Sequence, residues 1–252
     1  MSTKKHIHIS EDFELVRPFI EELLDNGVPD DARLVYKSRR NRNFCVERYG
    51  LKLNIKAFRI PPFPNSHIYG NIRKGKAERS YDNARALIEN GFDTPTPIAF
   101  AYRMDGCRMM ESYYVCMHLD DAFDMRDWDK NPRAGQALPG MAQLLADLHA
   151  KGIWHKDFSP GNILVNTDAK GVLHYNIIDL NRMRFNVHDP KRQLTNLKAV
   201  YIDSPEQTAR FGALYAQAVG KPAEWGEREA LRQLDKYWKN KKIHRFFKKL
   251  LK

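Results

Sequence analysis

The first half of the chain is dominated by short apolar runs in which hydrophobic and polar residues alternate. The clearest case is residues 51–58, where Leu53 and Ile55 are each flanked by polar residues. This period of two is typical of a strand with one buried face. Five segments show strand-like patterns: residues 34–36, 44–46, 51–58, 97–102 and 112–119.

Two other segments of this half have the longer period of a helix. The first covers residues 10–26, where Ser10 is a candidate N-cap and Gly27 can end the helix. Pro18 argues against a single straight helix there. The second covers residues 76–90. Its expected apolar stripe consists of Ala77, Tyr81, Ala84 and Ile88.

The second half is mainly helical in pattern. A polar, Asp-rich stretch over residues 120–133 has no period and suits a linker. It is followed by apolar residues at helical spacing that end before Gly152. These helical positions are Leu138, Met141, Leu144, Leu145 and Leu148.

A polar motif follows this helix. Within residues 153–166, His155, Asp157 and Asn162 have the spacing His-x-Asp-x-x-x-x-Asn, and a later apolar run ends in Asp179. Phosphoryl transfer from a nucleotide needs such a set, because one carboxylate takes the proton of the attacking hydroxyl while an amide and a second carboxylate hold Mg²⁺. We expect Asp157 in the first role and Asn162 with Asp179 in the second. His155 is expected to bond backbone near Asp179.

These motifs resemble the protein-kinase-like superfamily, and within it the lipopolysaccharide kinases that phosphorylate Kdo or heptose sugars of the inner core. The resemblance is carried by residues 154–164, 177–183 and 91–98. It implies a bilobal α+β fold, with a small antiparallel-sheet N-lobe over residues 1–119 and a mainly helical C-lobe over residues 120–252. It also implies ATP and Mg²⁺ as cofactors and a sugar or glycolipid as the acceptor.

The resemblance also implies a lysine and a carboxylate partner at the nucleotide end of the site. Lys56, at the end of a predicted strand, matches the superfamily lysine that contacts the nucleotide phosphates. Glu78 in the following helix is its expected partner, and Asp82 is the alternative. No G-x-G-x-x-G precedes Lys56. The first hairpin turn instead carries arginines within residues 39–42, which can clamp phosphate or simply be solvated.

The sequence around the catalytic motif departs from that of protein kinases. Ser159 stands where protein Ser/Thr kinases have a lysine, and Asp-Leu-Asn over residues 179–181 replaces Asp-Phe-Gly. No Ala-Pro-Glu or long activation loop follows. These differences favour an acceptor hydroxyl on a small molecule or glycan. Arg182 and Arg184 can bind an anionic acceptor or form salt bridges. The carboxylates considered for such salt bridges are Asp120, Asp121 and Asp189.

The chain carries a formal net charge of +11, which favours polyanionic partners such as nucleic acid, an anionic membrane or a phosphorylated glycolipid. Residues 236–252 are rich in Lys and Arg and contain no acidic residue. As a helix they would have an apolar stripe that either contacts an anionic membrane peripherally or packs on the C-lobe. That stripe consists of Ile243, Phe246, Phe247, Leu250 and Leu251.

The expected location is the cytoplasm, with a peripheral position on the inner membrane as an option. The first residues lack the apolar region of a signal peptide, and no run approaches the length of a transmembrane span. Cys45, Cys107 and Cys116 form no C-x-x-C pair, so buried thiols are expected.

Three other functions stay open at this stage. An atypical protein kinase resembling the RIO or tRNA-modification-associated kinases would use the positive charge to bind RNA. A kinase resembling the aminoglycoside or choline phosphotransferases would act on a small alcohol. A degenerate kinase fold would serve as a binding module without catalysis. This interpretation is disfavoured because the residues expected to act in catalysis are all present: Lys56, Asp157, Asn162 and Asp179. Nucleic acid is therefore a less favoured partner than a sugar, and the sequence fixes neither the acceptor hydroxyl nor the oligomeric state.

Overall fold

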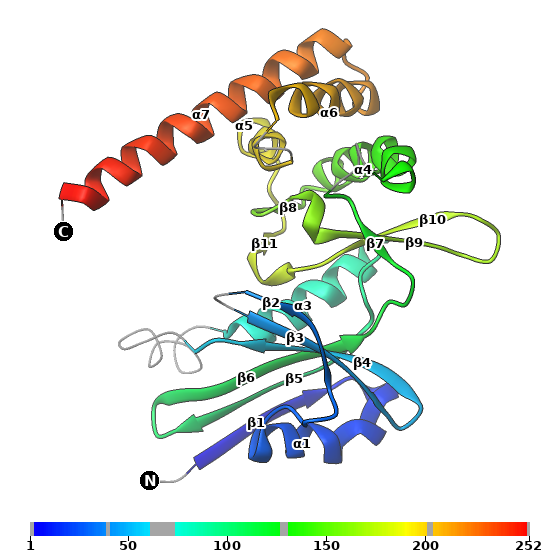
Figure 1. Ribbon diagram of the computed structural model, residues 1–252, viewed down its shortest axis with the longest axis vertical. Helices are drawn as coiled ribbons and strands as arrows, with labels where there is room; N and C mark the ends of the chain where they lie inside the picture. Colours follow the sequence, from blue (N-terminus) through cyan, green and yellow to red (C-terminus); the bar gives the residue numbers. More distant parts are fainter. Residues whose placement is uncertain (1–2, 39–40, 61–73, 127–130, 201–203, 251–252) are drawn as a thin grey trace. The chain divides into compact units, whose positions relative to one another are not determined.

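The chain forms two compact units. The computed structural model describes residues 3–38, 41–60, 74–126, 131–200 and 204–250 (Figure 1), with the side chains of the last helix described as far as Ile243. Two stretches, Met1–Asp120 and Asp179–Asn181, make up what we call the N-terminal unit. The C-terminal unit consists of Asp121–Ile178 and Arg182–Lys252.

A six-stranded antiparallel sheet is the main element of the N-terminal unit (Figure 1). Its strands, in spatial order, are β1 (Thr3–Ile9), β5 (Pro97–Asp105), β6 (Arg108–Met117), β4 (Leu51–Phe58), β3 (Asn41–Arg48) and β2 (Arg33–Lys37). All five predicted strands are confirmed; β2, β3 and β5 extend beyond the predicted bounds, whereas β6 begins four residues earlier and ends two residues earlier than predicted. Within β4, Leu53 and Ile55 are fully buried, as the alternation predicts. A sixth strand, β1, was not predicted; it pairs with β5 over its whole length.

Helices cover both faces of this sheet. On one face, α1 (Arg17–Asn26) packs Phe19 and Leu23 into the cluster that contains Leu53 and Ile55. On the other, α3 (Lys76–Glu89) packs against β4, β5 and β6, and its Tyr81 ring lies 5.5 Å from the ring of Phe100. The face of β4 opposite Ile55, which includes Lys56, is therefore the α3 face.

Several local details of these helices differ from expectation. The first helical segment is broken, as Pro18 indicates, into a 3₁₀ turn η1 (Glu11–Val16) and α1. Ser10 does not cap it, because its hydroxyl donates to the carbonyl of Pro97 and contacts the hydroxyl of Tyr81. In α3, Ile88 is 46 % exposed and Leu87 is buried in its place. Leu87 and Ile88 are adjacent, so the predicted apolar stripe is off by one residue near the end of α3.

The C-terminal unit is mainly helical, with short hairpins before its last helices. Its helices are α4 (Pro132–Ala150), α5 (Pro190–Gln193), α6 (Pro205–Ala218) and α7 (Ala223–Leu250). Its strands are β7 (Phe123–Asp124), β8 (Trp154–His155), β9 (Ile163–Thr167), β10 (Leu173–Ile177) and β11 (Met183–Arg184). They form a three-stranded sheet, β10-β9-β7, and a β11-β8 pair. The helix predicted before Gly152 is confirmed as α4, whose expected apolar positions are buried.

The helices α6 and α7 cross at a pair of glycines. A Cβ placed on Gly212 would lie 2.4 Å from the carbonyl oxygen of Gly226, and one placed on Gly226 would lie 2.0 Å from that of Gly212. Neither position can carry a side chain without moving a helix backbone. The absence of Cβ atoms therefore sets how closely α6 and α7 approach.

Two predicted basic segments lie partly outside the described residues. Arg39 and Arg40 of the basic turn lie outside the described residues. The predicted basic helix over residues 236–252 is part of α7, where Ile243 is 55 % exposed, but the other side chains of its apolar stripe are not described.

Of the cysteines, Cys116 is buried and Cys45 is half-buried, whereas Cys107 is exposed, contrary to expectation. No described helix has the length and apolar character needed to cross a membrane.

Candidate active site

The loop between β8 and β9 carries the first part of the predicted motif. It passes through Asp157 and a 3₁₀ turn, η2 (Pro160–Asn162), before entering β9. Phe158, the residue after Asp157, is fully buried and anchors the loop in the core of the C-terminal unit. Apolar anchoring on one side of Asp157 leaves its carboxylate on the accessible side, with 40 % of the side chain exposed.

His155 holds this loop from within. Its Nδ1 accepts a 3.1 Å hydrogen bond from the backbone amide of Asp157, so its Nε2 carries the proton and donates to the carbonyl of Ile178 at 3.3 Å. Ile178 is the residue before Asp179. The histidine thus ties the loop to the segment that leads to the second aspartate, and its expected structural role is confirmed.

Asn162 is fixed by both its backbone and its side chain. Its side-chain nitrogen Nδ2 donates to the backbone carbonyl of Asp157 at 2.8 Å. Its backbone carbonyl accepts from the backbone amide of Ile178 at 2.9 Å. With the side-chain nitrogen engaged in this way, the side-chain oxygen is the atom oriented to accept or to bind a cation. That orientation suits the metal-ligand role predicted for Asn162.

The carboxylate of Asp157 is bound by an arginine. Arg182 Nη1 donates to Asp157 Oδ2 at 2.8 Å. The salt-bridge partners expected for Arg182 (Asp120, Asp121 and Asp189) are therefore wrong, because Asp157 is its partner. This contact arises because β11, which begins one residue after Arg182, pairs with β8 and so brings Arg182 back to the loop between β8 and β9, the predicted catalytic loop.

Asp179 and Lys56 form an ion pair within the N-terminal unit. The Lys56 ammonium, whose side chain is only 13 % exposed, binds Asp179 Oδ1, which also accepts from Asn181 Nδ2 at 2.9 Å. A further bond from Asn83 of α3 to the carbonyl of Leu180, 2.7 Å long, fixes this turn. These contacts join Lys56 and Asp179, two of the predicted site residues.

The backbone of Asp179 is in the left-handed region, with φ of +59°. Non-glycine residues adopt this conformation rarely and at a cost of about 1–3 kcal/mol, usually where the surrounding structure over-determines it at a functional site. Here the bonds to Lys56 and Asn181 on one side, and the anchoring of Ile178 on the other, impose it. The turn aims the carboxylate of Asp179 at Lys56.

The expected pair of Lys56 and Glu78 is not the one found. Glu78 lies 3.4 Å from the ammonium of Lys74, and Asp82 lies 2.6 Å from the same group. Lys74 lies two residues before the start of α3 and four residues before Glu78, so it supplies a local cation to this helix end. The order of elements along the chain did not indicate that Lys56 forms its ion pair with Asp179.

A buried polar network behind the catalytic loop was missed altogether. Asn196, which is 1 % exposed, donates to the carbonyl of His155 at 2.6 Å. Its oxygen lies 3.0 Å from Nε2 of His149, whose Nδ1 lies 2.8 Å from the hydroxyl of Tyr215. Because Asn196 uses its nitrogen as donor, His149 donates through Nε2 and accepts from Tyr215 through Nδ1. No local pattern in the sequence indicates this network, because Asn196 stands in a mixed polar and apolar stretch.

The chain was also compared with known proteins. The model of the lipopolysaccharide kinase (Kdo/WaaP) family matches residues 65–215, a stretch that contains Glu78, Asp157, Asn162 and Asp179. No curated protein matches the chain with significant similarity.

Solved structures share the fold. A structure described as "WaaP in complex with acyl carrier protein" is 20 % identical, with a TM-score of 0.56, over 90 % of this chain and 99 % of the other. The Rio2 kinase–ADP/Mg²⁺–phosphoaspartate complex from Chaetomium thermophilum is 20 % identical, with a TM-score of 0.50, over 82 % of this chain and 65 % of the other. These likenesses identify the α+β protein-kinase-like fold. Together with the family match, which spans more than half of the chain, they show that the chain is a kinase and belongs to the Kdo/WaaP lipopolysaccharide kinase family.

Proposed function

We propose that this kinase transfers the γ-phosphoryl group of ATP, in the presence of Mg²⁺, to a hydroxyl of a Kdo or heptose sugar in the inner core of lipopolysaccharide. The observation that supports it most is the anchoring of the catalytic loop: Asp157 and Asn162 are held by bonds to each other, to His155 and to Ile178. In the proposed division of labour, residues 1–119 bind the nucleotide and residues 120–252 carry catalysis and acceptor binding.

Asp157 is the proposed catalytic base. The acceptor oxygen attacks the γ-phosphorus, the bond from that phosphorus to the bridging oxygen breaks, ADP leaves, and the proton of the hydroxyl passes to Asp157. Positioning and electrostatics supply most of the rate in such reactions. The bond from Arg182 restricts the carboxylate of Asp157 to one orientation, which favours a fixed approach of the acceptor.

Asn162 and Asp179 are the proposed Mg²⁺ ligands. Both offer hard oxygen atoms, which Mg²⁺ requires, and two protein ligands suffice because the ion keeps water and phosphate oxygens. The described residues hold no group of three or more His, Cys, Asp or Glu side chains suited to a metal, which such a two-ligand site does not need. Bound Mg²⁺ would neutralise charge on the phosphates. Lys56 would contribute a positive charge there.

Residues 236–252 are proposed to contact an anionic membrane from the cytoplasmic side. A glycolipid acceptor is embedded in a bilayer, and each basic residue near an anionic surface contributes about 1 kcal/mol to binding. Ile243 is exposed on α7, where it can enter such an interface. Deleting residues 241–252, which leaves Asn240 in place, should weaken binding to anionic liposomes while turnover on a soluble acceptor analogue persists. Equal liposome binding by both proteins would reject the membrane contact.

An acceptor screen tests the proposed function. Purified protein with labelled ATP and Mg²⁺ would be offered Kdo-lipid A, a heptose-containing core glycolipid, tRNA, choline and an aminoglycoside. We expect label only in a glycolipid, and no label when Asp157→Asn replaces the wild type. Transfer to choline, to the aminoglycoside or to protein alone would contradict the proposal, and so would label in the glycolipid with the Asp157→Asn variant.

A further inference from the structure

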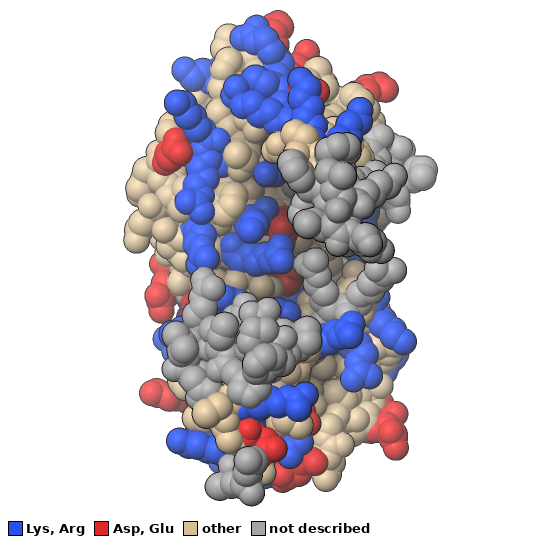
Figure 2. Space-filling model, turned by 90° about the vertical axis from the view of Figure 1, so that its left-hand side faces the viewer, with Lys and Arg blue, Asp and Glu red and all other residues tan. Residues whose placement is uncertain are grey.

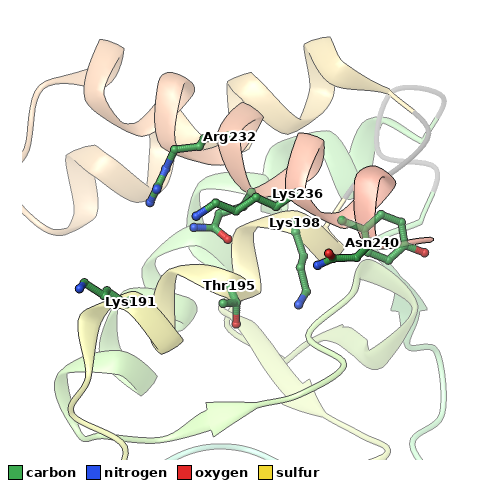
Figure 3. A pocket seen from close by; sticks show the side chains of 8 residues that line it. Lys191, Thr195, Lys198, Arg232, Lys236 and Asn240 are labelled. Atoms are coloured by element: carbon green, nitrogen blue, oxygen red, sulfur yellow. The ribbon is translucent and has the colours of Figure 1, made fainter. Parts of the chain in front are cut away.

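A cavity of about 610 Å³ opens in the C-terminal unit between α7 and the segment formed by α5 and the 3₁₀ helix η4 (Leu194–Ala199). We call it the basic pocket. Its described lining residues are Lys191, Thr195, Lys198, Arg232, Gln233, Lys236, Tyr237 and Asn240. In Figure 3 the Arg232 and Lys236 side chains extend from α7 on the side that faces α5 and η4. The pocket can hold a sugar together with an attached phosphate.

Among the described residues, the charge of the basic pocket is only partly balanced. Four of its described lining residues are cations, and none is a carboxylate. Only Arg232 has an ion-pair partner among the described residues, Glu229, which lies 2.6 Å away and also accepts from Gln233. Lys and Arg side chains gather on the upper part of the face in Figure 2, where the C-terminal unit lies. An unbalanced set of ammonium groups around a cavity favours an anionic ligand.

Lys198 is half-buried in the wall of the basic pocket. Its partial burial lowers its pKa, and the nearby charge of Lys156 lowers it further, while the charge of Asp157 acts in the opposite direction. The ammonium is therefore less well stabilised than in water, and a bound anion would compensate it. The effect of the Asp157 charge on Lys198 places the ammonium within electrostatic range of that carboxylate.

The wall of the basic pocket is fastened to the catalytic loop. The hydroxyl of Thr195 accepts from Trp154 Nε1 at 3.3 Å, and the guanidinium of Arg192 lies 4.6 Å from the centre of the Trp154 ring. Asn196, the next residue of η4, donates to the carbonyl of His155 at 2.6 Å. Since β8 (Trp154–His155) leads directly to Asp157, a ligand in the pocket is held at a fixed position relative to the catalytic carboxylate.

We propose that the basic pocket binds a phosphate group carried by the glycolipid acceptor and so positions the sugar hydroxyl beside Asp157. This proposal rests on the proposed function and adds the feature by which the acceptor is recognised. Three lysines and an arginine can neutralise a phosphate dianion through charge-assisted hydrogen bonds. Tyr237 and Asn240 add polar groups that can bond sugar hydroxyls.

A calorimetric titration of the full-length protein, without nucleotide, tests the binding step. The probes are a phosphorylated lipid A disaccharide, its dephosphorylated counterpart and inorganic phosphate. We expect Lys198→Gln and Lys236→Gln each to weaken binding of the phosphorylated disaccharide about tenfold, the effect of losing one charge-assisted bond. Lys221→Gln removes the same charge from an exposed site outside the pocket lining and should leave affinity within about twofold of wild type.

Turnover completes the test. Wild type should prefer the phosphorylated acceptor through a lower KM, and the two pocket variants should reduce that preference about tenfold. A wild type that phosphorylates the sugar while the pocket variants keep its preference would overturn the pocket and leave the proposed function standing. A wild type that phosphorylates no sugar would overturn both. Variant-sensitive binding of inorganic phosphate, without any effect on the phosphorylated disaccharide, would overturn the acceptor role.

Discussion

Arg182 and Asp157 form a 2.8 Å hydrogen-bonded ion pair between the residue before β11 and the loop after β8. The arginine lies three residues beyond Asp179, so the chain that carries the proposed metal ligand returns at once to the proposed base. Both side chains are about 40 % exposed. An ion pair at that exposure contributes little to stability, on the order of 1 kcal/mol or less, which points to positioning as its use.

Replacing Arg182 by Gln is expected to lower kcat about tenfold, because the carboxylate of Asp157 would lose its fixed orientation. Thermal unfolding should change little, since the pair is partly exposed. Arg184→Gln is the matched control, because Arg184 is exposed and two residues away. Steady-state kinetics on both variants check this. A kcat unchanged in Arg182→Gln, or reduced equally in Arg184→Gln, would contradict the positioning role.

Asn196 is expected to be required for stability of the catalytic loop. Its replacement by Ala leaves the carbonyl of His155 and Nε2 of His149 without their partner in a buried region, at a cost of about 1–3 kcal/mol each. Chemical denaturation of the variant should show a midpoint shift, with Gln217→Ala, an exposed change on α6, as the control. A midpoint equal to that of the control would show that the network does not hold the loop.

Stability should fall as the pH drops below 6.5, through His149. Burial lowers the pKa of His149 from 6.5 to about 4, and its hydrogen bond with Asn196 offsets only part of that effect. The unfolded chain therefore binds a proton that the folded chain does not between these values, so the free energy of unfolding decreases as the pH falls through this window. The total effect is on the order of 3 kcal/mol.

His149→Gln isolates that contribution from other histidines. Its free energy of unfolding would be measured at pH values about one unit apart between pH 7 and pH 4. It should depend less steeply on pH than that of wild type. Tyr215, which faces His149, does not titrate in this range, because burial raises its pKa to about 12. Parallel pH profiles for the two proteins would rule out His149 as the group responsible.

Gly212→Ala tests the close crossing of α6 and α7. The added Cβ would lie 2.4 Å from the carbonyl oxygen of Gly226, a contact that only a shift of helix backbone can relieve. Overpacking of this kind costs about 1–3 kcal/mol, whereas glycine to alanine in an open helix stabilises it by about 1 kcal/mol. Thermal unfolding should therefore show a lower melting temperature. A raised melting temperature would mean that the helices can separate freely.

The sequence predicted the elements whose signals are local. Alternation placed β4 and the spacing of apolar residues placed α4, and both are found. Strand β1 was not predicted, because most of its residues are polar: Lys4, Lys5, His6 and His8 leave only two apolar positions. Its pairing also depends on β5, a strand about ninety residues away. Strand pairs this distant in sequence depend on tertiary contacts that local patterns do not encode.

The site shows the same division between local and tertiary information. Motif spacing pointed to Asp157, Asn162 and Asp179, and the structure gives each of the three a specific set of hydrogen bonds. Partner choice was not predictable, because Lys56, Glu78 and Asp179 come from three separate stretches of chain and compete for contacts. The left-handed backbone of Asp179 was not predictable either, since aspartate adopts it only when neighbouring bonds require it.

Parallel measurement of turnover and of Mg²⁺-dependent nucleotide binding in Asp157→Asn and Asp179→Asn tests the central claim most directly. Asp157→Asn should lose about 10²- to 10⁴-fold in kcat while nucleotide affinity persists. Asp179→Asn should lose turnover and also bind the magnesium nucleotide about tenfold or more weakly, because a charged metal ligand is removed. Near-normal turnover in either variant, or loss of nucleotide binding in Asp157→Asn alone, would contradict the proposed division of roles.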